Sequence, residues 1–137
     1  MSESIKKIHV AVVDDHTLLR NALAKLIDWF DNFTVFFEAQ NGEELKQKLQ
    51  KKFIPEIILL DVNMPGMDGF ETAEWLFKNY PQIRILALSM FSDENTIIRM
   101  LKLGAKGYIM KTAEPEELHL ALKSVMQKNF YLSEYIT

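Results

Sequence analysis

Five polar residues stand directly after short apolar segments of the chain, and together they could bind a metal ion and handle a phosphoryl group. They are Asp14, Asp15, Asp61, Ser89 and Lys111. Two carboxylates about 4 Å apart repel each other by ~4 kcal/mol at an effective dielectric constant of 20, so a cluster of three is unfavourable without a cation. Carboxylate oxygens with room for water suit Mg²⁺ best. The residue types therefore predict a magnesium site.

A magnesium ion beside an aspartate and a lysine is also an arrangement for phosphoryl transfer. The metal and Lys111 would offset the charge of the phosphoryl oxygens while one aspartate attacks phosphorus. Ser89 can donate a hydrogen bond to the same phosphoryl group. The sequence contains neither a GxxxxGK[ST] phosphate-binding loop nor a GxGxxG fingerprint after its first apolar segment, so a bound nucleotide is poorly supported.

The elements that must position these residues alternate between strand and helix. The expected strands are 8–13, 33–38, 55–60, 83–88 and 106–110, and the expected helices are 18–27, 42–52, about 68–80, 94–103 and 115–126. This alternation is typical of a parallel sheet with helices on both faces. We therefore predict an α/β fold: a doubly wound (βα)5 three-layer sandwich with a five-stranded parallel sheet.

Ligands of an open parallel sheet bind outside the carboxyl ends of the strands. The loops that carry the three aspartates, Ser89 and Lys111 all open on that edge. If the sheet forms, three carboxylates, a hydroxyl and an ammonium group converge on one small surface. In isolation each has a simpler explanation, such as a helix cap for the acidic pair or a solvated position for the lysine.

Composition limits the class of protein. The 137 residues include no cysteine, 48% are hydrophobic, 26% are charged and the formal net charge is −3. These values describe one globular domain without disulfides or thiolate metal sites. The apolar runs are far shorter than the roughly 18 residues that span a bilayer, and the N-terminus has no apolar signal segment, so we expect a cytoplasmic protein. The mildly acidic balance argues against nucleic-acid binding by this segment.

The motifs around the polar residues resemble the receiver domain of two-component response regulators, from about Lys7 to about Lys128. The matching segments occur in the family's order and approximate spacing, and they are 12–16 (VVDDH), 60–69 (LDVNMPGMDG), 88–89 (LS) and 104–111 (GAKGYIMK). The resemblance implies the flavodoxin-like receiver fold. It makes 1–137 a single domain with a core of about 7–128, and makes 129–137 a C-terminal tail or the start of an interdomain linker.

The resemblance also implies a role for each residue of the acidic cluster. Asp61 is the expected phosphoacceptor, and Lys111 is expected to pair with the phosphoryl group. Asp15 is the expected direct Mg²⁺ ligand, with Asp14 as its water-mediated partner. Asn63 is expected to supply its backbone carbonyl to the metal.

The implied mechanism is a phosphorylation switch. A sensor histidine kinase donates the phosphoryl group, Ser89 moves toward it, and Tyr108 turns into the space that Ser89 leaves. Ser89 and Tyr108 thus form the switch couple. Such a domain supplies its own nucleophile and metal site, and we do not class it as a turnover enzyme.

Within the family, the sequence is most similar to the NarL/FixJ (LuxR) type. The features that carry this similarity are DDH at 14–16, Leu19-Arg20, the GAKGY segment and Tyr131-Leu132-Ser133. Such proteins carry a C-terminal helix-turn-helix domain, which implies DNA binding and transcription regulation by a full-length protein of which this chain is a fragment. Homodimers are expected through the first and fifth helices, or through the fourth helix, fifth strand and fifth helix.

Two other classes of function stay open. A phosphatase of the haloacid dehalogenase type also uses an aspartate nucleophile after a strand. It needs a second acid two residues later, and that position here is Asn63, which cannot act as the general acid. A stand-alone receiver that acts only as a protein-interaction module is the other alternative, because an acidic pocket indicates capacity and not use.

Three further features of the sequence lead to structural expectations. His16 lies beside the acidic pair, and we interpret it as a local hydrogen-bonding residue rather than a catalyst or metal ligand. Thr112 follows Lys111 where many receivers have a proline with a cis bond, and a non-proline cis bond costs about 3 kcal/mol. The helix 94–103 has apolar residues on more than one face, which indicates deeper burial or a partner surface.

Overall fold

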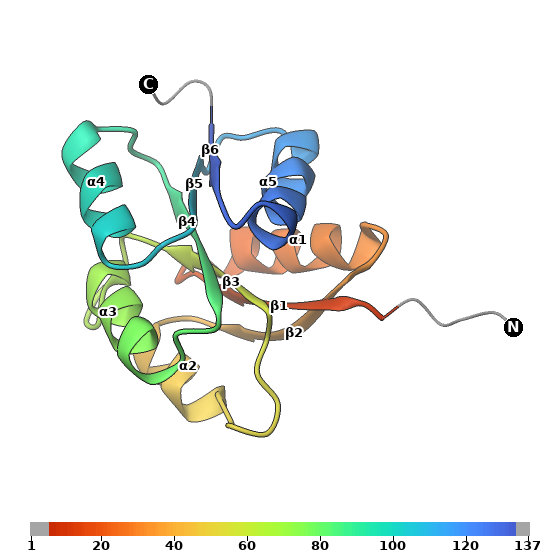
Figure 1. The fold of residues 1–137 in the computed structure, drawn as a ribbon, viewed down its shortest axis with the longest axis horizontal. Coiled ribbons are helices and arrows are strands. Elements are labelled where there is room, and N and C mark those ends of the chain that lie inside the picture. The colour runs from red at the N-terminus through yellow and green to blue at the C-terminus, as the bar shows by residue number, and fades with distance from the viewer. Residues whose placement is uncertain (1–5, 134–137) are drawn as a thin grey trace, which may run out of the picture.

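The computed structural model describes residues 6–133 and consists of one sheet between two layers of helices (Figure 1). The strands are β1 (Ile8–Val13), β2 (Phe33–Ala39), β3 (Ile57–Asp61), β4 (Arg84–Ser89), β5 (Gly107–Met110) and β6 (Tyr131–Leu132). The helices are α1 (Thr17–Trp29), α2 (Gly42–Lys48), α3 (Gly69–Asn79), α4 (Glu94–Lys102) and α5 (Pro115–Gln127). The predicted strand–helix alternation is confirmed.

The sheet is parallel throughout, with the strand order β2-β1-β3-β4-β5-β6. Helices α1 and α5 cover one face, while α2, α3 and α4 cover the other (Figure 1). From β1 the chain continues to β2, which pairs on one side of β1, and then crosses to β3, which pairs on the other side. The carboxyl ends of β1 and β3 therefore flank the topological switch point, where doubly wound sheets bind their ligands.

Two hydrophobic cores fix the sheet between its helices. Alternate residues of β1 point to opposite faces, so that Val10 and Val12 pack toward α1 and α5 while Ala11 and Val13 pack toward α2, α3 and α4. All four are fully buried. Strand β3 is buried along its whole length in the same way. A strand between two helical layers has no solvent face, which is why these segments are continuously apolar in the sequence.

The sheet has one strand more than the five predicted. Residues Tyr131–Leu132 pair with Gly107 and Tyr108 of β5, and the Tyr131 hydroxyl donates to Glu117 Oε2 at 2.9 Å. After α5 the chain reverses at Asn129, whose φ is 62°, and runs along the open edge of β5. Part of the expected tail 129–137 therefore belongs to the fold, while 134–137 lie outside the described residues. Two residues are too few to show a strand periodicity.

Helix α2 is shorter than predicted. It ends at Lys48 instead of continuing to Lys52, and the chain turns through 49–53 with an isolated bridge between Gln50 and Phe53. Leu45 and Leu49 are its buried apolar residues, so nothing beyond Leu49 ties another helical turn to the core. Within the described part of the chain, we find no helix with the length and apolar character that a membrane crossing requires.

Candidate magnesium and phosphoryl site

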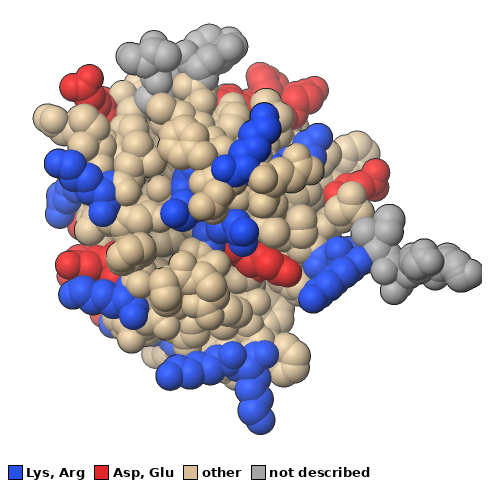
Figure 2. All heavy atoms as spheres, viewed as in Figure 1, with Lys and Arg blue, Asp and Glu red and all other residues tan. Residues whose placement is uncertain are grey.

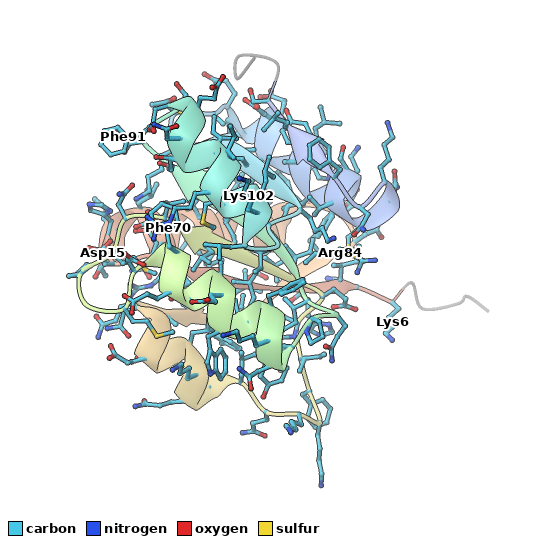
Figure 3. The ribbon with its side chains drawn as sticks, turned by 60° about the vertical axis from the view of Figure 1, so that its left-hand side comes forward. Lys6, Asp15, Phe70, Arg84, Phe91 and Lys102 are labelled. Atoms are coloured by element: carbon cyan, nitrogen blue, oxygen red, sulfur yellow. The ribbon has the colours of Figure 1, made fainter. Side chains whose placement is uncertain are left out.

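The sequence-predicted residues meet at the carboxyl edge of the sheet. Asp14 follows β1, Asp61 ends β3, Ser89 ends β4 and Lys111 follows β5. Figure 3 shows Asp15 at this end of the molecule and Arg84, the first residue of β4, at the opposite end. Parallel pairing of β1, β3, β4 and β5 brings their carboxyl ends to one place.

The Lys111 ammonium lies between two buried carboxylates. Its Nζ is 3.3 Å from Asp14 Oδ2 and 3.1 Å from Asp61 Oδ2. The side chains of both aspartates are fully buried, and that of Lys111 is 5% exposed. One ammonium group therefore faces two carboxylates, and Asp15, with a side chain 30% exposed, lies at the mouth of the cluster.

The electrostatics of this cluster favour a cation. Burial, and after it the charge of Asp14, raises the pKa of the Asp61 carboxyl from 3.8 to about 7, although Lys111 and the Asn63 amide oppose the shift. Three buried carboxylate oxygens receive no hydrogen bond from the described residues: Asp14 Oδ2, Asp15 Oδ1 and Asp61 Oδ2. Oxygens of this kind are suitable ligands for a hard divalent cation, which would relieve the repulsion between the carboxylates.

His16 belongs to the same cluster. Its backbone N–H donates to Asp14 Oδ1 at 2.8 Å, and its Nδ1 lies 3.2 Å from that oxygen and 3.2 Å from Lys111 Nζ. One ligand atom from each of Asp14, Asp15, His16 and Asp61 fits within 4.8 Å of the others. The histidine thus makes the local hydrogen bonds expected of it, and it also lies within reach of the metal position.

The loop after β3 fixes the Asp61 carboxylate. The backbone N–H of Asn63 donates to Asp61 Oδ1 at 3.1 Å, and the N–H of Val62 donates to Leu88 O at 3.0 Å. Helix α3 starts against this loop, because the N–H of Gly69 donates to Val62 O at 2.9 Å. The Asp68 side chain caps the helix by accepting from the N–H of Glu71.

Replacing Gly69 with alanine is expected to destabilise the domain by about 3 kcal/mol, measured by urea unfolding. A Cβ atom there would lie 2.5 Å from Val62 Cα and 2.6 Å from Asp61 O, and backbone atoms cannot move aside cheaply. Gly66→Ala is the matched control. Gly66 has a φ of 72°, but a Cβ atom there would meet only Glu43 Oε1 at an ordinary contact distance of 3.8 Å, so its substitution should cost about 1 kcal/mol. Equal losses for the two variants would contradict the close approach.

The expected switch couple is joined through the backbone of Phe91. Ser89 Oγ accepts a hydrogen bond from Phe91 N at 3.0 Å, and the Tyr108 hydroxyl donates to Phe91 O at 2.7 Å. Both side chains are fully buried, and burial raises the pKa of the Tyr108 phenol. Tyr108 therefore points inward in this structure, while the Ser89 hydroxyl still faces Phe91 N, and the motion expected of the couple stays a prediction.

Helix α4 combines a buried and an exposed apolar surface. Ile97 and Met100 are buried in the core, whereas Ile98 is 41% exposed and Phe91, which precedes the helix, is 57% exposed. The buried residues agree with the deeper burial interpreted from the sequence, whereas a partner surface at the exposed residues stays a prediction. The Lys111–Thr112 peptide bond is trans.

Arg20 is a residue of the site to which the sequence assigned no role. It lies on the first turn of α1, and its side chain, 14% exposed, reaches the backbone carbonyl of Asp14 and the carboxylate of Glu38 in β2. A lone arginine on a helix carries no chemical signal in the sequence. Its distance of six residues from Asp14 becomes informative only when the turn between β1 and α1 is known.

The fold and the acidic cluster define the class of protein. A family model described as the response regulator receiver domain matches residues 10–123, and the chain belongs to this family. The resemblance found from the motifs is thereby confirmed.

Among curated proteins, the chain is similar to two regulators. It is 39% identical over 128 residues to the nitrate/nitrite response regulator protein NarL of Escherichia coli (strain K12), covering 93% of this chain and 59% of that protein. It is 33% identical over 139 aligned positions to the transcriptional regulatory protein DegU of Brevibacillus brevis, covering 100% of this chain and 58% of that protein. The chain therefore spans somewhat more than half the length of these relatives.

Among solved structures, the chain is similar to a two-component response regulator of the LuxR family from Aurantimonas sp. SI85-9A1. The TM-score is 0.89 at 26% identity, and the match covers 96% of this chain and 93% of that one. The α/β receiver fold is thereby confirmed.

Proposed function

We propose that this domain accepts a phosphoryl group from a sensor histidine kinase on Asp61 and changes conformation in response. The observation that carries the proposal is the buried Asp61 carboxylate, 3.1 Å from Lys111 Nζ and next to other carboxylate oxygens without hydrogen bonds. An Asp61 oxygen attacks phosphorus, and the bond from phosphorus to the kinase histidine nitrogen breaks. Lys111 offsets the charge of the phosphoryl oxygens.

The residues of the acidic cluster fit Mg²⁺ as the metal of this reaction. Asp15, Asp61 and the Asn63 backbone carbonyl would hold the ion directly, and Asp14 through water. When bound, Mg²⁺ offsets negative charge on the transferring group. Three buried carboxylate oxygens that share one ammonium group and receive no hydrogen bond from the described residues support this assignment, because hard cations take oxygen ligands.

The phosphorylated state is read out through Ser89 and Tyr108. The Ser89 hydroxyl leaves the N–H of Phe91 and donates to a phosphoryl oxygen, while Tyr108 keeps its hydrogen bond to Phe91 O. A two-state domain needs about 5.5 kcal/mol of differential stabilisation to move from 1:99 to 99:1. The loop that carries the exposed Phe91 and the exposed face of α4 would then change together.

For the whole protein, we propose that residues 1–137 are the receiver domain and that a C-terminal helix-turn-helix domain follows in the full-length chain. The share of NarL and DegU that the chain covers, 59% and 58%, supports this proposal. DNA binding then belongs to the output domain. On the face in Figure 2, basic side chains are separated by uncharged and acidic groups, whereas phosphate contacts need clustered basic residues. The cytoplasmic location expected from the sequence stays a prediction.

A homodimer is the proposed form of the activated protein, and the surface of α1 and α5 is the one we favour. Trp29 at the end of α1 is 81% exposed and Leu120 of α5 is 50% exposed. A groove of about 440 Å³ lies between the two helices, and it is lined by Trp29, Phe30, Asp31, Pro115, Glu116 and His119. Burial of Trp29 and Leu120 against a second copy would remove apolar surface from water.

Incubating the domain with a small phosphodonor and Mg²⁺ separates the proposed switch from the two alternative functions. The switch should acquire one stable phosphoryl group per chain, seen by intact-protein mass spectrometry. Continuous phosphate release from diverse monoesters would support a phosphatase instead. No modification with any donor would support an interaction module and contradict the proposal.

A further inference from the structure

Arg20 binds the peptide group that joins Asp14 to Asp15, the two adjacent acidic residues of the site. Its Nη1 donates to Asp14 O at 2.9 Å, and its Nε donates to Glu38 Oε1 at 3.1 Å. Glu38 lies in β2, directly beside Val12 of β1. The guanidinium group therefore bridges the loop after β1 to the edge strand, with its two donors directed at two different acceptors.

The peptide groups on the two sides of Asp14 are held by different elements, one by the end of β2 and the other by Arg20 of α1. The Asp14 N–H donates to Ala39 O at 3.0 Å, and the Asp14 carbonyl receives the Arg20 hydrogen bond. The Asp14 carbonyl belongs to the peptide group that joins Asp14 to Asp15. Because a peptide group is planar, fixing its oxygen also fixes the direction in which the chain enters Asp15.

Asp15 has little else to orient it. Its Oδ1 is buried and receives no hydrogen bond from the described residues, and His16 Nδ1 lies 3.6 Å from it. By contrast, the Asp14 and Asp61 carboxylates each accept a backbone N–H at Oδ1, from His16 and Asn63. The direction of the Asp15 carboxylate therefore depends mainly on its backbone.

We propose that Arg20, anchored by Glu38, is a positioning residue for Mg²⁺ binding: it fixes the Asp14–Asp15 peptide group and thereby orients the Asp15 carboxylate. The inference rests on the proposed function, because it concerns the same metal position. Arg20 touches neither the Lys111 ammonium nor the Asp61 carboxylate in any hydrogen bond or ion pair of the described residues. It acts through the backbone and not on the phosphoryl group. Partners that orient metal ligands typically change metal affinity by about 10- to 100-fold when they are removed.

An effect of the positive charge of Arg20 and an effect of its position predict opposite changes in Mg²⁺ affinity when Arg20 is replaced, which makes the inference testable. If Arg20 acted through its positive charge, Arg20→Ala would strengthen cation binding, and Glu38→Gln would weaken it by leaving Arg20 unpaired. If Arg20 acts by position, Arg20→Ala weakens binding. Glu38→Gln then leaves binding nearly unchanged, because the amide oxygen of the substituted side chain can still accept from Nε and the bond to Asp14 O remains.

The experiment titrates the folded domain with MgCl₂, without phosphodonor, and follows the backbone amide signals of 14–16 by NMR. We expect the Kd for Mg²⁺ to rise by about 10-fold in Arg20→Ala and to stay within about 2-fold in Glu38→Gln. Arg84→Ala is the matched control, since Arg84 lies at the opposite end of the sheet (Figure 3), and its Kd should equal that of the wild type. Urea unfolding of the metal-free variants reports separately on any general loss of stability.

An unchanged or lower Kd in Arg20→Ala, with the wild type binding Mg²⁺, would overturn this inference and leave the proposed function intact. A wild-type domain that binds no Mg²⁺ would overturn both. If Arg20→Ala does not fold, Arg20→Met takes its place. Methionine keeps an unbranched apolar stem but cannot donate a hydrogen bond to Asp14 O, so a Kd equal to that of the wild type would again overturn the positioning role.

Discussion

Replacement of Asp61 with asparagine is expected to reduce phosphoryl incorporation from one group per chain to none. A carboxylate oxygen is the nucleophile in the proposed reaction, and the amide that replaces it is not nucleophilic. The substitution keeps the shape of the side chain, and the amide oxygen can still accept the Asn63 N–H now bound to Asp61 Oδ1. Loss of labelling would therefore reflect chemistry and not misfolding. Intact-protein mass spectrometry after incubation with a small phosphodonor and Mg²⁺ is the measurement.

Asp68→Asn is the matched control for this experiment. Asp68 lies seven positions later at the start of α3, where its side chain caps the helix by accepting from Glu71 N. Asparagine is an equally good cap, so the variant should fold and take up one phosphoryl group like the wild type. A phosphoryl group retained by Asp61→Asn would place the acceptor at another carboxylate and refute the assignment.

Asp61→Asn is also expected to stabilise the metal-free domain at neutral and alkaline pH. The pKa of Asp61 is about 7 in the folded protein against an ordinary value of 3.8, chiefly because of burial and then of the Asp14 charge. Between these values the folded state binds the proton that the unfolded chain has released. Stability therefore falls as pH rises from 3.8 to 7, by about 1.4 kcal/mol per pH unit from this group, and the loss is complete above the folded pKa.

Urea unfolding in a chelator measures this cost as the difference between Asp61→Asn and the wild type. The advantage of the variant should be small at about pH 4 and should approach about 4 kcal/mol at about pH 8. Saturating Mg²⁺ should narrow the gap at the higher pH, since a cation that binds the ionised carboxylate stabilises only the folded state. A difference in unfolding free energy between the two proteins that does not change with pH would contradict this prediction, because it would show that ionisation of the buried Asp61 carboxyl does not destabilise the folded domain.

Much of the fold and site could be predicted from the sequence because the determining physics is local or periodic. A strand buried on both faces must be continuously apolar, and β3 is recognisable for that reason. Parallel strands separated by helices bring their carboxyl ends to one edge, so the meeting of Asp14, Asp61 and Lys111 follows from their positions after strands. The Asp68 cap follows from a spacing of three residues.

Other features depend on contacts between segments whose separation leaves no pattern in the chain. The pairing of Tyr131–Leu132 with β5 involves two residues and an edge that only the folded sheet presents. The inward position of Tyr108 depends on a hydrogen bond to Phe91 O, 17 residues away. A tyrosine in a short strand has the same sequence pattern in either orientation, so only the structure establishes which one it takes.

The sequence by itself determined the class of fold and the acidic cluster, because periodicity and residue type carry that information. The choice of Asp61 as the expected nucleophile came from the resemblance of the surrounding motifs to the receiver family. The tertiary structure alone decided how the cluster is held. Arg20 and Glu38 are 18 residues apart, on a helix and an edge strand, and neither carries a chemical signal of its own. Arg20 alone binds the Asp14 carbonyl, and Glu38 comes within reach of Arg20 only once β2 pairs with β1, because hydrogen bonds between distant segments depend on their placement in space and not on their spacing in the chain.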